Sequence, residues 1–191
     1  MRVIGGKYRS RRLRSLPGLD LRPSADRLRE TLFDVLSAGD PNALNATVWI
    51  DLFAGTGAVG IEALSRGAKM VYFVDSSSRA AKLIEDNLEP LKVEAEFQIL
   101  KQDFMPALRK IENMGIQADF IFLDPPYAMQ EVYNRAMRRL SDSPVVKIDS
   151  VVIAEHDKRF DPGEIFGSLG RTRKLVQGDA ALSFYRRAQT R

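Results

Sequence analysis

The stretch Ile121–Tyr127 places a carboxylate, two prolines and an aromatic ring directly after an apolar run. An apolar run that ends at prolines is typical of a buried strand, and each proline keeps the residue before it extended. Prolines have no N–H group, so the carbonyls beside them are available to accept hydrogen bonds from outside. With Asp124 and Tyr127 at hand, these acceptors suit a flat ligand that carries an amino group, such as a nucleobase.

A glycine-rich stretch, Asp51–Gly60, follows an earlier apolar segment and fits the pattern G-x-G-x-x-G through Gly55, Gly57 and Gly60. Glycines at this spacing let the chain turn tightly from a strand into a helix and approach a ligand closely. The pattern alone also fits a nicotinamide-nucleotide site, or a turn with no ligand. Asp75 comes 24 residues after the start of this stretch. At about this distance an acidic residue binds ribose hydroxyls, although a helix cap is the other interpretation.

Acidic residues also follow the next two apolar segments. Asp103 could accept a hydrogen bond from an adenine amino group with Phe104 packed beside the ring, and a cap for the following helix explains Asp103 equally well. Asp124 ends the segment after that. Because ligands of open parallel sheets bind beyond the carboxyl ends of the strands, these acids and the glycine turn together describe a pocket for an adenosine. A redox dinucleotide would need donors for its pyrophosphate, whereas acids favour a cationic ligand.

The rest of the sequence predicts the scaffold that positions these residues. Strands and helices alternate from residue 47 onward, which is typical of a parallel sheet with helices on both faces. Two segments flanking Gly178-Asp179-Ala180 predict a closing β-hairpin with at least one antiparallel strand. The predicted strands span 47–52, 69–75, 95–101, 118–124, 151–155, 173–177 and 181–186, giving a mostly parallel seven-stranded sheet. The predicted helices span 23–38, 58–65, 78–91, 106–113 and 130–140, the first capped by Ser24.

The N-terminal segment is strongly basic. Residues 1–30 hold nine basic and three acidic side chains, a net charge of +6, so the other 161 residues carry a net −2. Clustered positive charge, with a pI of about 9.4, is typical of a protein that binds a polyanion. A solvated tail is the alternative, but apolar residues such as Val3 and Leu13 are interleaved with the charges. We therefore expect residues 1–22 to form a basic arm, with 2–4 and 7–16 paired as a hairpin, and residues 23–191 to form the main domain.

Composition narrows the class of protein further. No run approaches the ~18 apolar residues of a membrane span, and the N-terminus lacks the apolar core of a signal peptide. The chain has no Cys and one His, so we expect neither disulfides nor a dedicated metal site. These features favour a cytoplasmic protein, and we expect a monomer.

Several segments resemble a known family. Asp51–Gly57 resembles the first motif of class I S-adenosylmethionine-dependent methyltransferases, and Asp124–Tyr127 resembles their fourth motif in the form used for exocyclic amines of bases. Val3–Leu13, Arg22–Phe33 and Gly178–Tyr185 are similar to segments of the RsmD-type 16S rRNA (guanine(966)-N(2))-methyltransferases. This resemblance covers nearly the whole chain.

The resemblance implies a Rossmann-like class I methyltransferase that transfers a methyl group from S-adenosylmethionine to the N2 amine of a guanine in 16S rRNA, within a small-subunit particle and without a metal. The catalytic residues it implies are Asp124, Pro125, Pro126 and Tyr127. The cofactor-binding residues are Asp51, Phe53, Ala54, Gly55, Gly57, Asp75, Asp103, Phe104 and Asp124. The residues expected to contact RNA are Lys7, Arg9, Arg11, Arg12, Arg22, Arg27 and Arg29.

Three other functions stay open. The fourth motif by itself also fits an adenine-N6 methyltransferase acting on DNA or RNA, and only the N-terminal segments favour guanine. A nucleic-acid-binding module with an inactive cofactor pocket is a second alternative, although an intact Asp124–Tyr127 argues against it. A nicotinamide-dependent oxidoreductase is the third.

Overall fold

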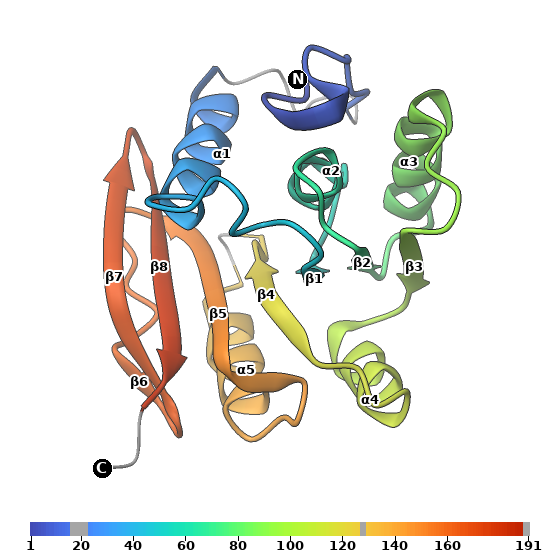
Figure 1. Ribbon diagram of the computed structural model, residues 1–191. Coiled ribbons are helices and arrows are strands. Elements are labelled where there is room, and N and C mark those ends of the chain that lie inside the picture. The colour runs from blue at the N-terminus through green and yellow to red at the C-terminus, as the bar shows by residue number, and fades with distance from the viewer. Residues whose placement is uncertain (16–22, 127–128, 189–191) are drawn as a thin grey trace.

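A computed structural model describes residues 1–15, 23–126 and 129–188 (Figure 1). Within these residues one sheet has the strand order β3-β2-β1-β4-β5-β8-β7-β6. The strands are β1 Val48–Leu52, β2 Met70–Asp75, β3 Phe97–Lys101, β4 Ala118–Leu123, β5 Val146–Asp157, β6 Ile165–Phe166, β7 Leu169–Gln177 and β8 Ala180–Arg187. The helices are α1 Pro23–Leu36, α2 Ala58–Ser65, α3 Ser78–Leu88, α4 Phe104–Asn113 and α5 Gln130–Ser141, with short 3-10 turns η1 Gly6–Tyr8 and η2 Glu89–Leu91.

The sheet confirms the predicted α/β fold and differs from the prediction at one edge. Strands β1 to β5 pair in parallel, and β8 pairs antiparallel with both β5 and β7, as the predicted hairpin requires. The prediction of seven strands was wrong by one, because β6 forms an eighth. A strand of two residues is too short to show a period-2 pattern in the sequence.

Several helix ends differ from the predicted boundaries. Helix α1 spans Pro23–Leu36, so it ends two residues before the predicted end at residue 38, and Ser24, the predicted cap, lies within its first turn instead of before it. The predicted helix 78–91 divides into α3 and η2, because Pro90 has no N–H group with which to continue the α-helix. No helix in the described part of the chain is long and apolar enough to cross a membrane.

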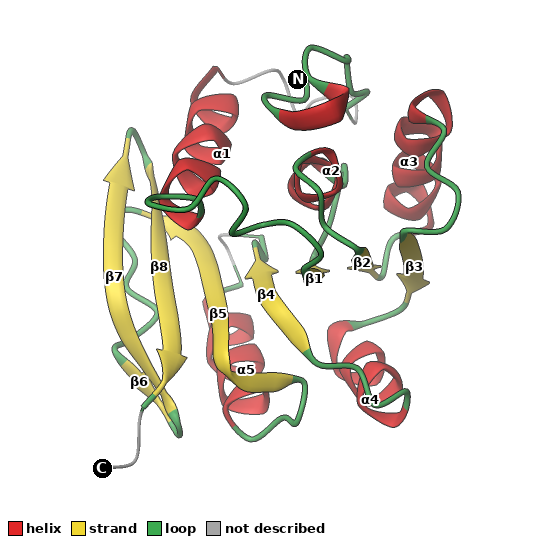
Figure 2. Cartoon of the chain, viewed as in Figure 1, coloured by secondary structure: helices red, strands yellow, loops and turns green. Residues whose placement is uncertain are grey.

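The helices cover the sheet in two layers, with α1, α2 and α3 on one face and α4 and α5 on the other (Figures 1 and 2). Alternation along β1 shows how each face is filled. Trp49 points into the layer of α1 to α3, where its ring stacks on Phe33 and Phe120 with centroids 5.3 and 4.6 Å apart. Ile50 and Leu52 point into the opposite core, which α4 and α5 complete.

Residues 1–15 fold back across α2 and α3 (Figure 1). Within these residues a single antiparallel bridge joins Arg2 to Arg12, and η1 lies between them. The predicted hairpin is therefore reduced to a loop closed by one bridge. Gly6, at φ +73°, passes so close to α2 that a Cβ would lie 1.8 Å from the carbonyl oxygen of Ser65. Val3 and Leu13 are buried in the same core as α1 to α3.

Helix α2 approaches β2 so closely that Gly60 has no room for a side chain. A Cβ built there would lie 2.2 Å from Cε1 of Phe73 and 2.8 Å from Cγ1 of Val71. We expect Gly60→Ala to lower the free energy of unfolding by about 1–3 kcal/mol, because overpacking outweighs the better helix propensity of Ala. Urea unfolding measures this change. Gly170→Ala is the matched control, because a Cβ built at Gly170 would have no neighbouring atom within 4 Å. This variant should change the free energy of unfolding by no more than about 0.5 kcal/mol. Equal stability of the two variants would contradict the packing argument.

Candidate active site

The glycine turn and the Asp124-Pro125-Pro126 segment meet where the sheet changes its order. Strands β1 and β4 are neighbours, and Leu52 pairs with Leu123 at their carboxyl ends. The next residue of β4 stays alongside β1, because the N–H of Asp124 lies 3.5 Å from the carbonyl oxygen of Leu52. The chain therefore brings the acid of one motif next to Leu52, the second residue of the other.

The glycine turn has an unusual backbone conformation that neighbouring side chains hold in place. Phe53, Gly55 and Gly57 all have positive φ, at +64°, +54° and +74°. Asp75 accepts the N–H of Gly55 at 2.9 Å, and a second oxygen of its carboxylate accepts the N–H of Ser77 at 2.8 Å. Asp75 thus fixes the turn and the residues that lead into α3. The N-cap of α3 is Ser77, so the interpretation of Asp75 as the helix cap is wrong, and its role in binding ribose stays a prediction.

Asp51 and Ala54 lie at the buried side of the same turn. The carboxyl of Asp51 is 2% exposed and accepts the N–H of Gly60 at 3.0 Å, so it braces α2. The N–H of Ala54 donates to the carbonyl of Val74 at 2.9 Å, which joins the turn to β2.

Three carboxyl groups gather at the ends of β1, β4 and β5. Burial raises the pKa of Asp51 to about 8, the N–H of Gly60 works against this rise, and Asp75 and Glu155 add to it. Asp124 is partly exposed as a residue, but the surroundings of its carboxyl raise its pKa well above the usual range, through burial first and then through Glu155 and Asp51. Mutually repelling acids of this kind favour a cationic ligand.

Tyr133 of α5 fastens the ends of β4 and β5 together. Its buried hydroxyl lies 2.8 Å from the carbonyl oxygen of Glu155 and 3.3 Å from that of Pro125. Sequence analysis missed both Tyr133 and Glu155. Glu155 ends the predicted strand 151–155, so the strand-end reasoning used for the other acids would have found it. Nothing in the helical pattern distinguishes Tyr133 from any other core residue.

Asp103 and Phe104 lie at the start of α4. Asp103 is exposed and caps the helix, its carboxylate accepting the N–H of Met105 at 3.1 Å, which is the second of the two interpretations given above. The ring of Phe104 is buried, and its centroid lies 5.4 Å from that of Phe53. The guanidinium of Arg135 lies 5.7 Å from the same ring. Phe104 therefore supports Phe53 at the first position of the glycine turn.

The basic residues of the N-terminal region divide into exposed and buried ones. Arg9, Arg11, Arg12 and Arg27 are exposed, and Lys7 is half exposed with its ammonium 3.8 Å from Glu96. The expectation that Arg29 contacts RNA is wrong, because its side chain is only 4% exposed. Arg22 and Tyr127 lie outside the described residues.

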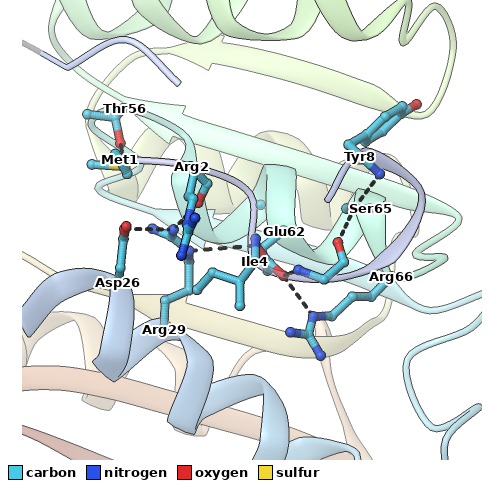
Figure 3. Close-up of polar contacts among 12 residues, drawn as sticks. Met1, Arg2, Ile4, Tyr8, Asp26, Arg29, Thr56, Glu62, Ser65 and Arg66 are labelled. Carbon is cyan, nitrogen blue, oxygen red and sulfur yellow. Dashed lines mark hydrogen bonds and ion pairs between the residues drawn. The ribbon is translucent and has the colours of Figure 1, made fainter. Parts of the chain in front are cut away.

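Arg29 belongs to a buried cluster that holds the arm onto α2 (Figure 3). Its guanidinium donates to the carbonyl of Arg2 at 2.5 Å and to Asp26 at 3.0 Å, and its Nε lies 3.8 Å from Glu62. The fully buried carboxylate of Glu62 accepts the N–H groups of Ile4 and Gly5, each at 2.7 Å. A buried charge is tolerated only when it is paired and hydrogen-bonded in this way.

The strand order, the glycine turn after β1 and the acid after β4 define a class I methyltransferase fold. Residues 1–186 match the family described as "Conserved hypothetical protein 95". The chain belongs to this family, the RsmD family of S-adenosylmethionine-dependent methyltransferases.

Relatives from bacteria are similar over most of their length. YlbH of Bacillus subtilis is 33% identical over 188 residues, covering 98% of this chain and 99% of that protein. Ribosomal RNA small subunit methyltransferase D of Escherichia coli is 28% identical over 187 residues, covering 98% and 90%. Among solved structures, the protein yhhF of Escherichia coli superposes with a TM-score of 0.81 at 28% identity, covering 100% of this chain and 99% of that one.

A more distant structure shares the fold alone. SMU.776, solved in complex with SAH, superposes with a TM-score of 0.68 at 14% identity, over 87% of this chain and 50% of that one.

The raised pKa of Asp51 has a consequence for stability. Because the native carboxyl holds its proton up to about pH 8 while the unfolded one loses it near pH 4, the native state binds more protons between these values. The free energy of unfolding should therefore fall as pH rises from 5 to 8, by up to about 1.4 kcal/mol per pH unit from this group. Urea unfolding at several pH values measures the slope, and Asp51→Asn should flatten it.

Comparison with the variant separates Asp51, together with its effect on the pKa of Asp124, from the other titrating groups. Buried His156 has a lowered pKa, chiefly through burial, so it acts in the opposite direction, and it is common to both proteins. The carboxylates of Asp157 and Asp161, whose pKa values are lowered mainly by Arg159 and Arg171, are ionised in both states above about pH 5. Parallel slopes for the wild type and Asp51→Asn would show that Asp51 is ionised throughout.

Proposed function

We propose that this chain transfers the methyl group of S-adenosylmethionine to the exocyclic N2 amine of a guanine in 16S rRNA. The observation that carries the proposal is the position of Asp124 at the switch point, with its N–H 3.5 Å from the carbonyl of Leu52 and its carboxyl beside those of Asp51 and Glu155. The 16S target is supported by the names of relatives, which include ribosomal RNA small subunit methyltransferase D in three organisms.

The residues at the turn fit S-adenosylmethionine. Gly55 and Gly57 leave the backbone open to a ligand, and Asp75 follows at the end of the neighbouring strand, where an acid can bind ribose hydroxyls. The carboxyls of Asp51 and Asp124 favour the positive charge of a sulfonium. When bound there, the cofactor supplies an electrophilic methyl group.

The acid after β4 prepares the amine for attack. An exocyclic amine is a poor nucleophile because its lone pair is delocalised into the base. Accepting its two N–H bonds, through the carboxyl of Asp124 and the carbonyl of Pro125, favours a pyramidal nitrogen whose lone pair points at the methyl group. Such positioning lowers barriers by roughly 7–11 kcal/mol in favourable cases. Transfer of the methyl group would leave the amine nitrogen cationic, and Asp124 is placed to accept the proton that this nitrogen then loses.

The carbonyl of Pro125 retains capacity for this role. Among the described residues the hydroxyl of Tyr133 contacts it at 3.3 Å, and that hydroxyl lies closer, at 2.8 Å, to the carbonyl of Glu155. A carbonyl oxygen has two lone pairs, so the contact fixes the direction of the group and leaves one acceptor position. Positioning by Tyr133 thus supports the proposed mechanism.

The target guanine must leave its stack to reach this edge of the sheet. The proposal assigns Tyr127 to stack on it, worth about 1–3 kcal/mol for a base on an aromatic ring. The phosphates that flank the base are bound by exposed cations, namely Lys7, Arg9, Arg11, Arg12 and Arg27. Arg22 is added to this set from the sequence alone. The partner is 16S rRNA, within a small-subunit particle.

Replacing Asp124 tests the proposed chemistry. Asp124→Ala should reduce methyl transfer to background, because both the acceptor for the amine and the base are lost, while S-adenosylhomocysteine binding by calorimetry stays measurable. Tritiated methyl transfer to 16S rRNA, naked and in 30S particles, measures activity. Asp149→Ala, an exposed acid at the opposite end of β5, is the matched control and should behave as the wild type. Near-normal methylation by Asp124→Ala would refute the assignment, and N6-methyladenosine in digested wild-type product would favour the adenine alternative.

The salt dependence of RNA binding tests the arm. Because each phosphate contact releases counterions, the logarithm of the affinity should fall linearly with the logarithm of the salt concentration, by about 0.7 per contact for single-stranded RNA. Changing Arg9, Arg11 and Arg12 together to Ala should make the slope shallower by about two. Fluorescence anisotropy with an RNA oligonucleotide between 50 and 300 mM salt measures both slopes. A flat response of the wild type would exclude a phosphate-binding arm.

A further inference from the structure

The arm and α3 form an open groove whose residues have no part in the chemistry described above. Its volume is about 400 Å³, and its lining includes Arg14 and Ser15 of the arm and Ser78, Arg79, Lys82 and Asp86 of α3. Three of these six side chains are cationic and one is anionic. Lys82 and Arg14 both contact Asp86, at 2.9 and 3.5 Å, and Lys82 also lies 3.8 Å from Glu85 of α3. Among the lining residues themselves the cations outnumber the acids.

The main chain of Arg14 is fixed at this groove by one buried side chain. Asn87 of α3 is 3% exposed, and its Oδ1 accepts the N–H of Arg14 at 2.7 Å. Its Nδ2 donates back to the carbonyl of Arg14 at 3.2 Å. The guanidinium of Arg14 remains 71% exposed on this anchored backbone. A cation whose backbone is already ordered loses less conformational entropy when it binds an anion.

The same Asn87 side chain also reaches the cofactor turn. Its Nδ2 donates to the carbonyl of Thr56 at 3.0 Å, and Thr56 lies between Gly55 and Gly57. A second contact runs from the Thr56 hydroxyl to the sulfur of Met1, 3.7 Å apart, at the other end of the arm (Figure 3). The arm and the turn are therefore linked twice, through Asn87, which bonds both, and through the direct contact of Met1 with Thr56.

We propose that the groove formed by Arg14, Arg79 and Lys82 binds a phosphate of the RNA backbone, and that Asn87 couples this contact to the cofactor turn. The inference rests on the proposed function, since it takes RNA as the partner. Arg11 and Arg12, which precede Arg14 in the arm, are exposed as well. Arginine and lysine are the side chains that bind phosphates best, and a backbone tracking along the arm would reach the groove next.

Binding of RNA and binding of the cofactor are coupled because Asn87 bonds both the arm and the turn. A phosphate held by Arg14 restricts the arm to the position in which Asn87 bonds both Arg14 and Thr56, and this is the position in which the turn is ordered for the cofactor. A first ligand that orders a region lowers the entropic cost for the second, and the effect is reciprocal. RNA should therefore raise cofactor affinity, and cofactor should raise RNA affinity by the same factor.

The groove is tested by removing its two helix cations. Arg79→Ala/Lys82→Ala should weaken binding of an RNA oligonucleotide and make the salt slope shallower by about 0.7 for one lost phosphate contact. The matched control is Arg109→Ala/Lys110→Ala, two adjacent exposed cations on α4, on the other face of the sheet, and it should retain the wild-type slope. Equal slopes for both double variants would overturn the groove as a binding site. Displacement of RNA by inorganic phosphate at constant ionic strength would instead assign the groove to a free phosphate.

The coupling is tested by calorimetry with S-adenosylhomocysteine, which has no methyl group to transfer. In the wild type, saturating RNA should lower its Kd about fivefold or more, the lower end of typical coupling. In Asn87→Ala this ratio should approach one. The groove variant provides a second measurement if Asn87→Ala does not fold: its Kd without RNA should match the wild type, and its response to RNA should be reduced. If saturating RNA leaves the Kd of the wild type for S-adenosylhomocysteine unchanged, the coupling is refuted.

The outcomes separate this inference from the proposed function. A wild type that binds no RNA and methylates none refutes the proposed function. A wild type that binds and methylates RNA, together with a groove variant that shows the same salt slope and the same ratio of Kd values, refutes only the inference.

Discussion

The parallel pairing of β1 with β4 is the constraint on which the candidate site depends. These strands are separated in the sequence by α2, β2, α3, η2, β3 and α4, yet Leu52 and Leu123 are register partners at the sheet's switch point. Parallel strands end at the same edge, so the turn after one strand and the acid after the other must lie side by side. With any other neighbour for β1, Asp124 would stand beside a different loop, and neither residue could serve the same ligand.

This edge of the sheet is electrostatically unfavourable in the absence of a ligand. Burial raises the pKa of both Asp51 and Asp124; Glu155 adds to both rises, and Asp51 adds to that of Asp124. Well-packed apolar residues would be more stable there. Groups held in such positions are a common feature of sites that bind or transform an opposite charge. The neighbouring backbone is costly too, because Phe53 has a positive φ at the first position of the turn.

The sequence predicted the parts of this molecule whose signals are local. Gly55, Gly57 and Gly60 and the alternating apolar segments led to the sheet and to the turn, because periodicity and glycine requirements act over a few residues. Tertiary contacts decided the rest. The sequence predicts Arg29 to be one more surface cation in a basic segment. Only the packing of α1 against the arm shows that its side chain is buried.

Glu62 is a second residue whose role depends on tertiary contacts. In the sequence it is one acid in the short helix that follows the glycine turn, with no feature that predicts burial. In the structure it accepts two N–H groups of the arm and lies between Arg29 and Arg66, the latter at 2.8 Å. Two of the basic side chains near the arm thus neutralise a buried acid and hold the arm folded. Net charge overstates the number of cations available to RNA, and the exposed ones keep a defined position because the buried ones hold the backbone beneath them. The affinity of this surface for a polyanion is therefore a property of the folded arm as well as of its composition.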